Sequence, residues 1–132
     1  MPKFSDKSNK ILSTCDVRLQ KLFNEVIKYF DCTIVCGFRN QADQDKAFAE
    51  GNSKLKWPDG KHNKTPSLAV DVVPCFNGTL LWDAKECCYM GGIVLGIAYS
   101  LGLKIRWGGD FNRNNNVLDE KFSDLVHFEI DE

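Results

Sequence analysis

Two histidines and one aspartate are the residues of this chain best suited to hold a metal ion. His62 lies nine positions before Asp71 in the stretch "GKHNKTPSLAVDVVP", and His127 lies further along the chain in "DLVHFEI". Asp71 is surrounded by Ala and Val, where a carboxylate is costly unless it is paired or binds a cation. Two imidazoles and one carboxylate suit Zn²⁺, and three protein ligands leave a fourth position open for water, as in catalytic zinc sites. Surface histidines and a hydrogen-bonded aspartate would account for the same composition.

These three residues need a sheet and a loop to bring them together. We expect Asp71 on a short strand, 68–74, His127 on a terminal strand, 125–130, and His62 in the polar loop 51–67 before the first of them. The predicted fold is α+β, a single domain over 1–132, with an about four-stranded, largely antiparallel sheet, three helices and a zinc cleft on the sheet. The other expected elements are helices over about 15–30, from Asn40 to Gly51 and from Asp83 to near Gly102, and strands over 32–38 and 103–109.

The composition excludes several classes of protein. The chain has 132 residues, 43% hydrophobic and 27% charged, which is typical of a soluble globular protein. The 17 basic and 18 acidic residues leave no basic footprint for nucleic acid. The most apolar stretch, 91–103, is too short to span a bilayer, and the first residues lack the apolar core of a secretory signal. We therefore expect a monomer made in a cytoplasm, with neither nucleic acid nor membrane as partner.

The six cysteines predict neither a disulfide framework nor a zinc finger. No CxxC pair occurs, and Cys87 and Cys88 are adjacent within a helical pattern. Cys32 and Cys36 would share one face of a regular strand, but at a separation of roughly 13 Å, too far for one bridge or one ion. We expect free thiols that pack as small hydrophobic side chains.

Three separated blocks resemble a known group of enzymes. "CGFRNQADQ", "SLAVDVVP" preceded by His62, and "DLVHFEI" are similar to motifs of the zinc peptidases that cut bacterial cell-wall peptides. That group comprises D-Ala-D-Ala carboxypeptidases and dipeptidases and, closest in size, phage endolysins that are L-alanyl-D-glutamate endopeptidases. The blocks span about residues 30–130. The resemblance implies that His62, Asp71 and His127 bind zinc and that the substrate is the stem peptide of peptidoglycan. The loop in "HNKTPSLAVD" is two residues longer than the common spacing, with Ser67 in place of a glycine, which a loop can absorb.

The same resemblance implies the remaining catalytic residues. A carboxylate three residues before the last histidine serves as the base in the family, and Asp124 has that position. Residues three apart on a strand point to opposite faces, so Asp124 can reach the metal only from the loop before the strand. Glu129, on the same face as His127, is the alternative. Arg39, in the family's G-x-R position, would stabilise the oxyanion, and Gln44 also matches the family.

Other features leave alternatives open. Trp57 and Trp107 would flank the site, either as cleft walls or as packing. The Asp- and Asn-rich segment 110–124 lacks EF-hand spacing. A D,D-carboxypeptidase would share the whole metal site, and a wall-binding module could keep zinc for structure alone. Compact size and the absence of a signal fit a phage endolysin that accumulates in the host cytoplasm and acts on the wall after release.

Overall fold

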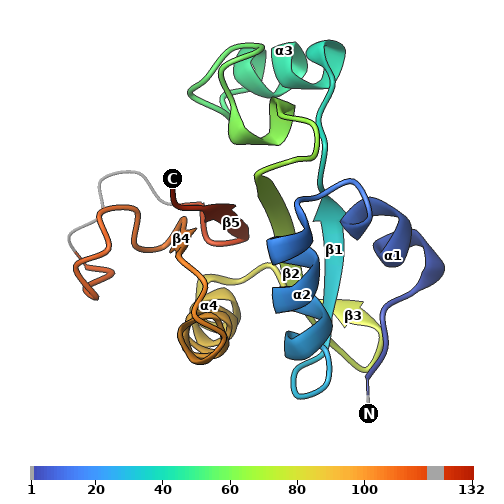
Figure 1. Ribbon diagram of the computed structural model, residues 1–132, viewed down its shortest axis with the longest axis vertical. Helices are drawn as coiled ribbons and strands as arrows, with labels where there is room; N and C mark the ends of the chain where they lie inside the picture. The colour runs from blue at the N-terminus through green and yellow to red at the C-terminus, as the bar shows by residue number, and fades with distance from the viewer. Residues whose placement is uncertain (1, 119–123) are drawn as a thin grey trace.

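An antiparallel sheet of five strands forms the centre of the computed structural model, which describes residues 2–118 and 124–132 (Figure 1). Four strands follow the order β1-β2-β5-β4, and β3 pairs with the far end of β2. Every pairing between these strands is antiparallel. The strand bounds are β1 Cys32–Cys36, β2 Ala69–Phe76, β3 Thr79–Leu80, β4 Ile105–Trp107 and β5 His127–Ile130.

The helices begin where polar side chains cap their first turns. Ser5, Asp16, Asn40 and Asp83 each accept a hydrogen bond from a backbone N–H of the helix that follows, which satisfies a donor without an intrahelical partner. The bounds are α1 Asp6–Leu12, α2 Val17–Val26, α3 Gln41–Ala49 and α4 Ala84–Ser100, with a short 3₁₀ helix, η1, at Lys61–Asn63.

The hydrophobic core lies between the sheet and helices α2 and α4, which also pack against each other. Leu22 and Phe23 of α2 meet Val70 and Val72 of β2 and Phe128 of β5 in one buried cluster. The rings of Phe23 and Phe128 are in edge contact, with centroids 5.5 Å apart. This packing leaves the opposite side chains of β2 and β5 available for a site.

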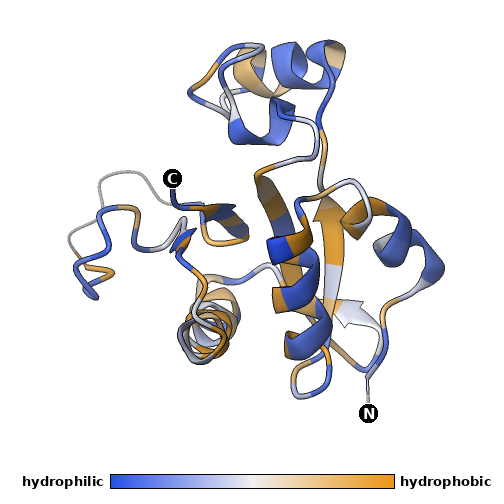
Figure 2. Cartoon of the chain, viewed as in Figure 1, coloured by the Kyte–Doolittle hydropathy of each residue, from blue (hydrophilic) through white to orange (hydrophobic). Residues whose placement is uncertain are grey.

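The segment 40–66, which contains α3 and η1, is built differently. It extends beyond the end of the sheet, away from α2 and α4, and Figure 2 shows that it is mostly hydrophilic. Its buried residues are Gln44, Gly60, His62 and Asn63, so none of them is a large apolar side chain. Hydrogen bonds rather than a hydrophobic core hold this segment in place.

An irregularity in β1 changes the face on which Cys36 lies. Ile34 pairs with Val72, but Cys36 pairs with Asp71, so one extra residue of β1 is accommodated between them. A bulge of this kind shifts the alternation of side chains. Cys36 therefore lies on the face of Asp71, whereas Cys32 stays in the core. The expectation that the two thiols share a face is wrong for this reason.

The predicted fold class is confirmed, and three elements were not expected. The sequence pattern missed α1, η1 and the two-residue strand β3. The strand expected at 125–130 begins at His127, which leaves Asp124 outside it. All six cysteines are free, as predicted. None of the helices in the described ranges has the length and apolar character needed to cross a membrane.

Candidate metal centre

Strand register brings two of the three predicted ligands together. Asp71, the third residue of β2, pairs with Cys36 of β1 on one side and with His127 of β5 on the other. His62 comes from η1, and two backbone hydrogen bonds hold this turn against the neighbouring chain. The amide of Arg39 donates to the carbonyl of His62 (2.8 Å), and the amide of Leu68 donates to the carbonyl of Lys61 (3.0 Å).

The three predicted ligand side chains form a nearly equilateral triangle of atoms. Nε2 of His62 lies 3.2 Å from Oδ1 of Asp71 and 3.3 Å from Nδ1 of His127, and this Nδ1 lies 3.3 Å from the same Oδ1. Two ligands about 2.0–2.1 Å from a tetrahedral metal ion lie about 3.3–3.4 Å apart. The donor set and its spacing therefore fit such an ion.

The outer nitrogen of each imidazole is already engaged. Nδ1 of His62 lies 2.8 Å from the carbonyl oxygen of Gly37, and Nε2 of His127 lies 2.7 Å from Oε1 of Glu129. Each of these nitrogens donates its hydrogen to the oxygen, because neither oxygen can donate. In the neutral imidazoles, the nitrogens that face Asp71 then carry lone pairs, so three acceptor atoms converge on a position that suits a proton or a metal ion.

The local charge favours that cation. Burial alone would raise the pKa of Asp71, but His62 and hydrogen bonds to both imidazoles hold it well below its usual range. Burial alone would lower the pKa of His62, but the charge and hydrogen bond of Asp71 raise it to about 10. The negative potential that stabilises a proton at this position also stabilises a metal ion.

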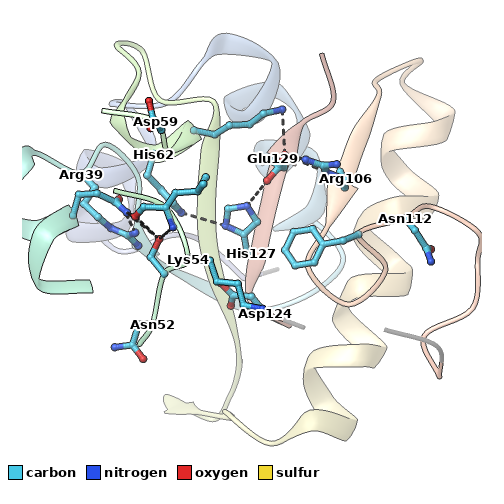
Figure 3. A pocket seen from close by; sticks show the side chains of 16 residues that line it. Arg39, Asn52, Lys54, Asp59, His62, Arg106, Asn112, Asp124, His127 and Glu129 are labelled. Carbon is cyan, nitrogen blue, oxygen red and sulfur yellow. Dashed lines mark hydrogen bonds and ion pairs between the residues drawn. The ribbon is translucent and has the colours of Figure 1, made fainter. Parts of the chain in front are cut away.

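Glu129 lies on the far side of His127 from the triangle (Figure 3). Its carboxylate accepts from Arg106 at 2.8 Å and pairs with Lys61 at 3.1 Å, and its side chain is only 8% exposed. Burial opposes ionisation, but the hydrogen bonds from His127 and Arg106 outweigh it and lower the pKa of Glu129 to about 2. This carboxylate is therefore charged and fully engaged by His127, Arg106 and Lys61.

Asp124 reaches the other side of the triangle from the segment before β5. An oxygen of its carboxylate lies within 4.8 Å of ligand atoms of both Asp71 and His127. Its amide donates to the carbonyl of Gly108, and its carbonyl accepts from the amide of His127 (2.8 and 3.0 Å). A side chain at position 108 would collide with that segment, since a Cβ would lie 1.9 Å from the carbonyl oxygen of Asp124. Burial is the main cause of a raised pKa at Asp124, and the charge of Asp71 adds to it.

Arg39 is held over Asp71 by a buried polar network. Its Nη2 lies 3.5 Å from Oδ2 of Asp71, and its Nη1 donates to Oε1 of Gln44 at 3.1 Å. The same oxygen of Gln44 accepts from Asn63 (3.0 Å), while Nε2 of Gln44 donates to the carbonyl of Leu55 (2.6 Å). Gln44 is 1% exposed, and its hydrogen bonds link α3, the loop and η1 to the guanidinium. The sequence indicated Gln44 only through a motif and gave no sign of Asn63.

A cavity of about 730 Å³ opens onto the triangle (Figure 3). Its walls include the two histidines, Asp124 and Arg39. Trp107 does not line it: this side chain is 3% exposed, donates from Nε1 to the carbonyl of Leu125 (2.8 Å) and stacks on Phe128. Of the two roles considered for Trp107, packing is the one observed, and it supports the segment that carries Asp124. Trp57 also lies outside the lining of this cavity.

Cys36 is a neighbour of the site that sequence reasoning missed. Its Sγ lies 3.9 Å from Nδ1 of His62, and it accepts from Nη2 of Arg39 at 3.7 Å. Cys36, His62 and Asp71 also lie close enough to hold a metal ion. Only the pairing of position 36 with Asp71 reveals this, and the bulge that creates it has no signature in the strand pattern.

The comparisons with known proteins agree with this architecture. A family model described as phage L-alanyl-D-glutamate peptidase matches residues 1–130. The L-alanyl-D-glutamate peptidase of Escherichia phage T5 is 33% identical over 121 residues, which cover 89% of this chain and 88% of that protein. The crystal structure of the Serratia marcescens L-Ala D-Glu endopeptidase ChiX superposes with a TM-score of 0.78 at 20% identity, over 98% of this chain and 90% of the other. At that identity the structural likeness speaks for the fold alone.

Proposed function

Because this chain belongs to the phage L-alanyl-D-glutamate peptidase family, we propose that it hydrolyses the L-alanyl-D-glutamate bond in the stem peptide of peptidoglycan. We further propose that His62, Asp71 and His127 hold a zinc ion. The observation that carries this proposal is the triangle of three acceptor atoms with edges of 3.2–3.3 Å. Nitrogen and oxygen donors at this spacing suit zinc in a site that keeps one position open.

The surrounding residues have separate roles in the reaction. A bound zinc ion supplies Lewis acidity, which activates water and polarises a carbonyl. Asp124 accepts the proton of the attacking water and transfers it to the nitrogen of the leaving amine. Its raised pKa suits both steps, because a carboxyl group that holds a proton more firmly is a better acceptor and can still donate. Arg39 stabilises the negative charge that develops on the substrate carbonyl oxygen.

Glu129 is better placed to position His127 than to act as the base. Its hydrogen bond to Nε2 orients the ring so that Nδ1 faces the triangle. Its ion pairs with Lys61 and Arg106 keep it charged and occupied on the side away from Asp71. We therefore assign proton transfer to Asp124.

The proposed site of action is the bacterial wall, reached from inside the host cell after the protein is released. This fits a phage enzyme that is made in the cytoplasm of its host, and the substrate lies outside the membrane.

Digestion of purified peptidoglycan tests the activity directly. The expected product is a new amino-terminal D-Glu, with no release of free D-Ala. Release of free D-Ala instead would indicate a D,D-carboxypeptidase. If the zinc-loaded protein cleaved nothing, a non-catalytic wall-binding module would be the remaining interpretation. Chelation should abolish hydrolysis and stoichiometric zinc should restore it, with bound metal measured in the same samples.

A further inference from the structure

A second cavity of about 590 Å³ also reaches the candidate metal centre. It shares Arg39, Asn52 and Asp124 with the first cavity and in addition touches Asp71. The two cavities therefore meet at the metal centre and lead away from it over different residues. A substrate whose scissile bond lies at the metal must extend in both directions, so each cavity accepts one flank of the stem peptide.

Trp82 lines this second cavity and is 60% exposed. Single exposed apolar residues are common on protein surfaces and by themselves mean little. Among the described apolar side chains that expose more than half of their surface, however, Trp82 is the one whose cavity also includes Asp71 and Asp124. A large aromatic surface thus faces solvent beside the proposed reaction centre.

The backbone on both sides of Trp82 is fixed. The amide of Leu81 donates to the carbonyl of Pro74 on β2 at 2.8 Å. Asp83 caps α4 through a hydrogen bond from the amide of Glu86 at 3.2 Å. Trp82 is therefore presented from the junction of the sheet and α4, on backbone that need not be ordered when a ligand packs on the ring.

The charges of the two cavities indicate which flank each accepts. Apart from the shared residues, the first cavity contains three basic side chains and two acidic ones: Lys54, Lys61, Arg106, Asp59 and Glu129. The second contains one basic and two acidic side chains beyond the shared residues and Asp71, together with Trp82, Val35 and Val126. The D-Glu side of the scissile bond carries carboxylates, whereas the L-Ala side joins an uncharged muramic-acid sugar. Complementarity directs the anionic flank to the first cavity and the saccharide flank to the second.

We propose that Trp82 forms a saccharide subsite, in which the indole packs against the muramic-acid sugar attached to L-Ala. The inference rests on the proposed function, since it takes its orientation from the bond that is cut. Aromatic side chains suit such a ligand because they offer a flat apolar surface and a polar N–H at its edge. The subsite makes the enzyme prefer stem peptides that are still attached to glycan.

Two substrates that differ in the sugar but not in charge at the amino terminus test this subsite. One is a peptide that contains L-Ala-D-Glu with its amino terminus acetylated, called the free peptide because it carries no sugar. The other is the same peptide with N-acetylmuramic acid in amide linkage on its amino terminus. The ratio of kcat/KM for the muramyl peptide to that for the free peptide should fall about tenfold in Trp82→Ala and much less in Trp82→Phe. Tyr99→Ala, which removes a similarly exposed ring (58%) that lines neither cavity, should leave the ratio unchanged. An unchanged ratio in Trp82→Ala, or an equal fall in Tyr99→Ala, would overturn the proposal.

A binding measurement separates failure of the subsite from failure of the proposed function. In the zinc-loaded Asp124→Asn protein, which should not cleave, calorimetry should show at least about fivefold tighter binding of the muramyl peptide than of the free peptide. Adding Trp82→Ala should remove that difference. If the wild-type protein cleaves neither substrate, the proposed function fails, and this binding comparison still decides the saccharide subsite. Equal affinities for the two peptides in Asp124→Asn would refute it.

Discussion

Neutralising Glu129 tests whether this carboxylate supports a metal ligand or is itself the proton acceptor. Glu129→Gln removes the charge that faces Nε2 of His127 at 2.7 Å and leaves Arg106 and Lys61 beside a neutral amide. Loss of such a partner lowers metal affinity about 10–100-fold, or about 1.4–2.7 kcal/mol. Because the glutamine oxygen can still accept from Nε2, we expect the lower end, about tenfold.

The assay measures zinc affinity by competition with a chromophoric chelator and, separately, kcat at saturating zinc. Glu129→Gln should bind zinc about tenfold more weakly and keep most of its kcat once the metal is saturating. The matched variant is Asp124→Asn, which neutralises a carboxylate on the other side of the triangle by the same change from acid to amide. It should keep its zinc affinity within about threefold and lose about 10²–10⁴-fold in kcat.

The opposite pattern would refute this assignment of roles. If Glu129→Gln bound zinc like the wild type and lost kcat by about two orders of magnitude or more, Glu129 would be the base. If neither substitution changed zinc affinity or kcat, the triangle would not be the reaction centre. Circular dichroism of both variants excludes loss of the fold as the cause.

Three further predictions use other contacts. Gly108→Ala should destabilise the protein by more than about 1 kcal/mol and lower activity, because its Cβ would lie 1.9 Å from the carbonyl oxygen of Asp124. Gly92→Ala on α4, where a Cβ meets open space, should instead raise stability by up to about 1 kcal/mol. Thermal unfolding compares the two variants, and equal effects would contradict the close approach of Gly108 to Asp124. Gln44→Ala removes the oxygen that accepts from both Arg39 and Asn63, and it should lower the free energy of unfolding in urea by about 1–3 kcal/mol. Because Arg39 keeps its contact to Asp71 but loses this support, KM should rise or kcat should fall, and unchanged stability would mean that water replaces the network. Ionised Glu129 stabilises the fold because its pKa is about 2 in the folded protein and 4.5 in the unfolded chain. This contribution, at most about 3 kcal/mol, is fully present above pH 4.5 and should be lost as pH falls from about 4.5 towards 2. The difference in stability between wild type and Glu129→Gln should therefore vanish over that range, and a constant difference would argue against the ion pairs.

The sequence pointed to Asp71 as a candidate ligand because burial of a charge is expensive wherever it occurs, and the structure places it beside both histidines. From the sequence alone, the position of Asp71 within an apolar strand indicated that its carboxylate must be paired or bind a cation. The helix starts expected at Asn40 and Asp83 were also local signals and were confirmed, since each side chain caps its helix. Side-chain alternation set the condition that Asp124 must lie before the terminal strand to reach the metal, and in the structure it does lie before β5.

The features that were missed depend on contacts between distant segments. Cys36 reaches the site only because β1 has an irregularity opposite Asp71, and nothing in "CTIVCGF" marks it. The partners of Glu129 come from β4 and η1, so their ion pairs require the strand register. Trp82 was overlooked because its cavity is formed by residues that are distant in the sequence.

The three proposed ligands belong to two parts of the molecule that are held by different forces. Asp71 and His127 are neighbours in the sheet ladder, which the hydrophobic core stabilises, whereas His62 belongs to the segment 40–66, whose buried residues are polar. An ion bound at the triangle would therefore link the sheet to the segment 40–66. Removing the ion should leave the strand pairing intact and loosen this segment first, so amide hydrogen exchange should rise in 40–66 before it rises in β2 or β5.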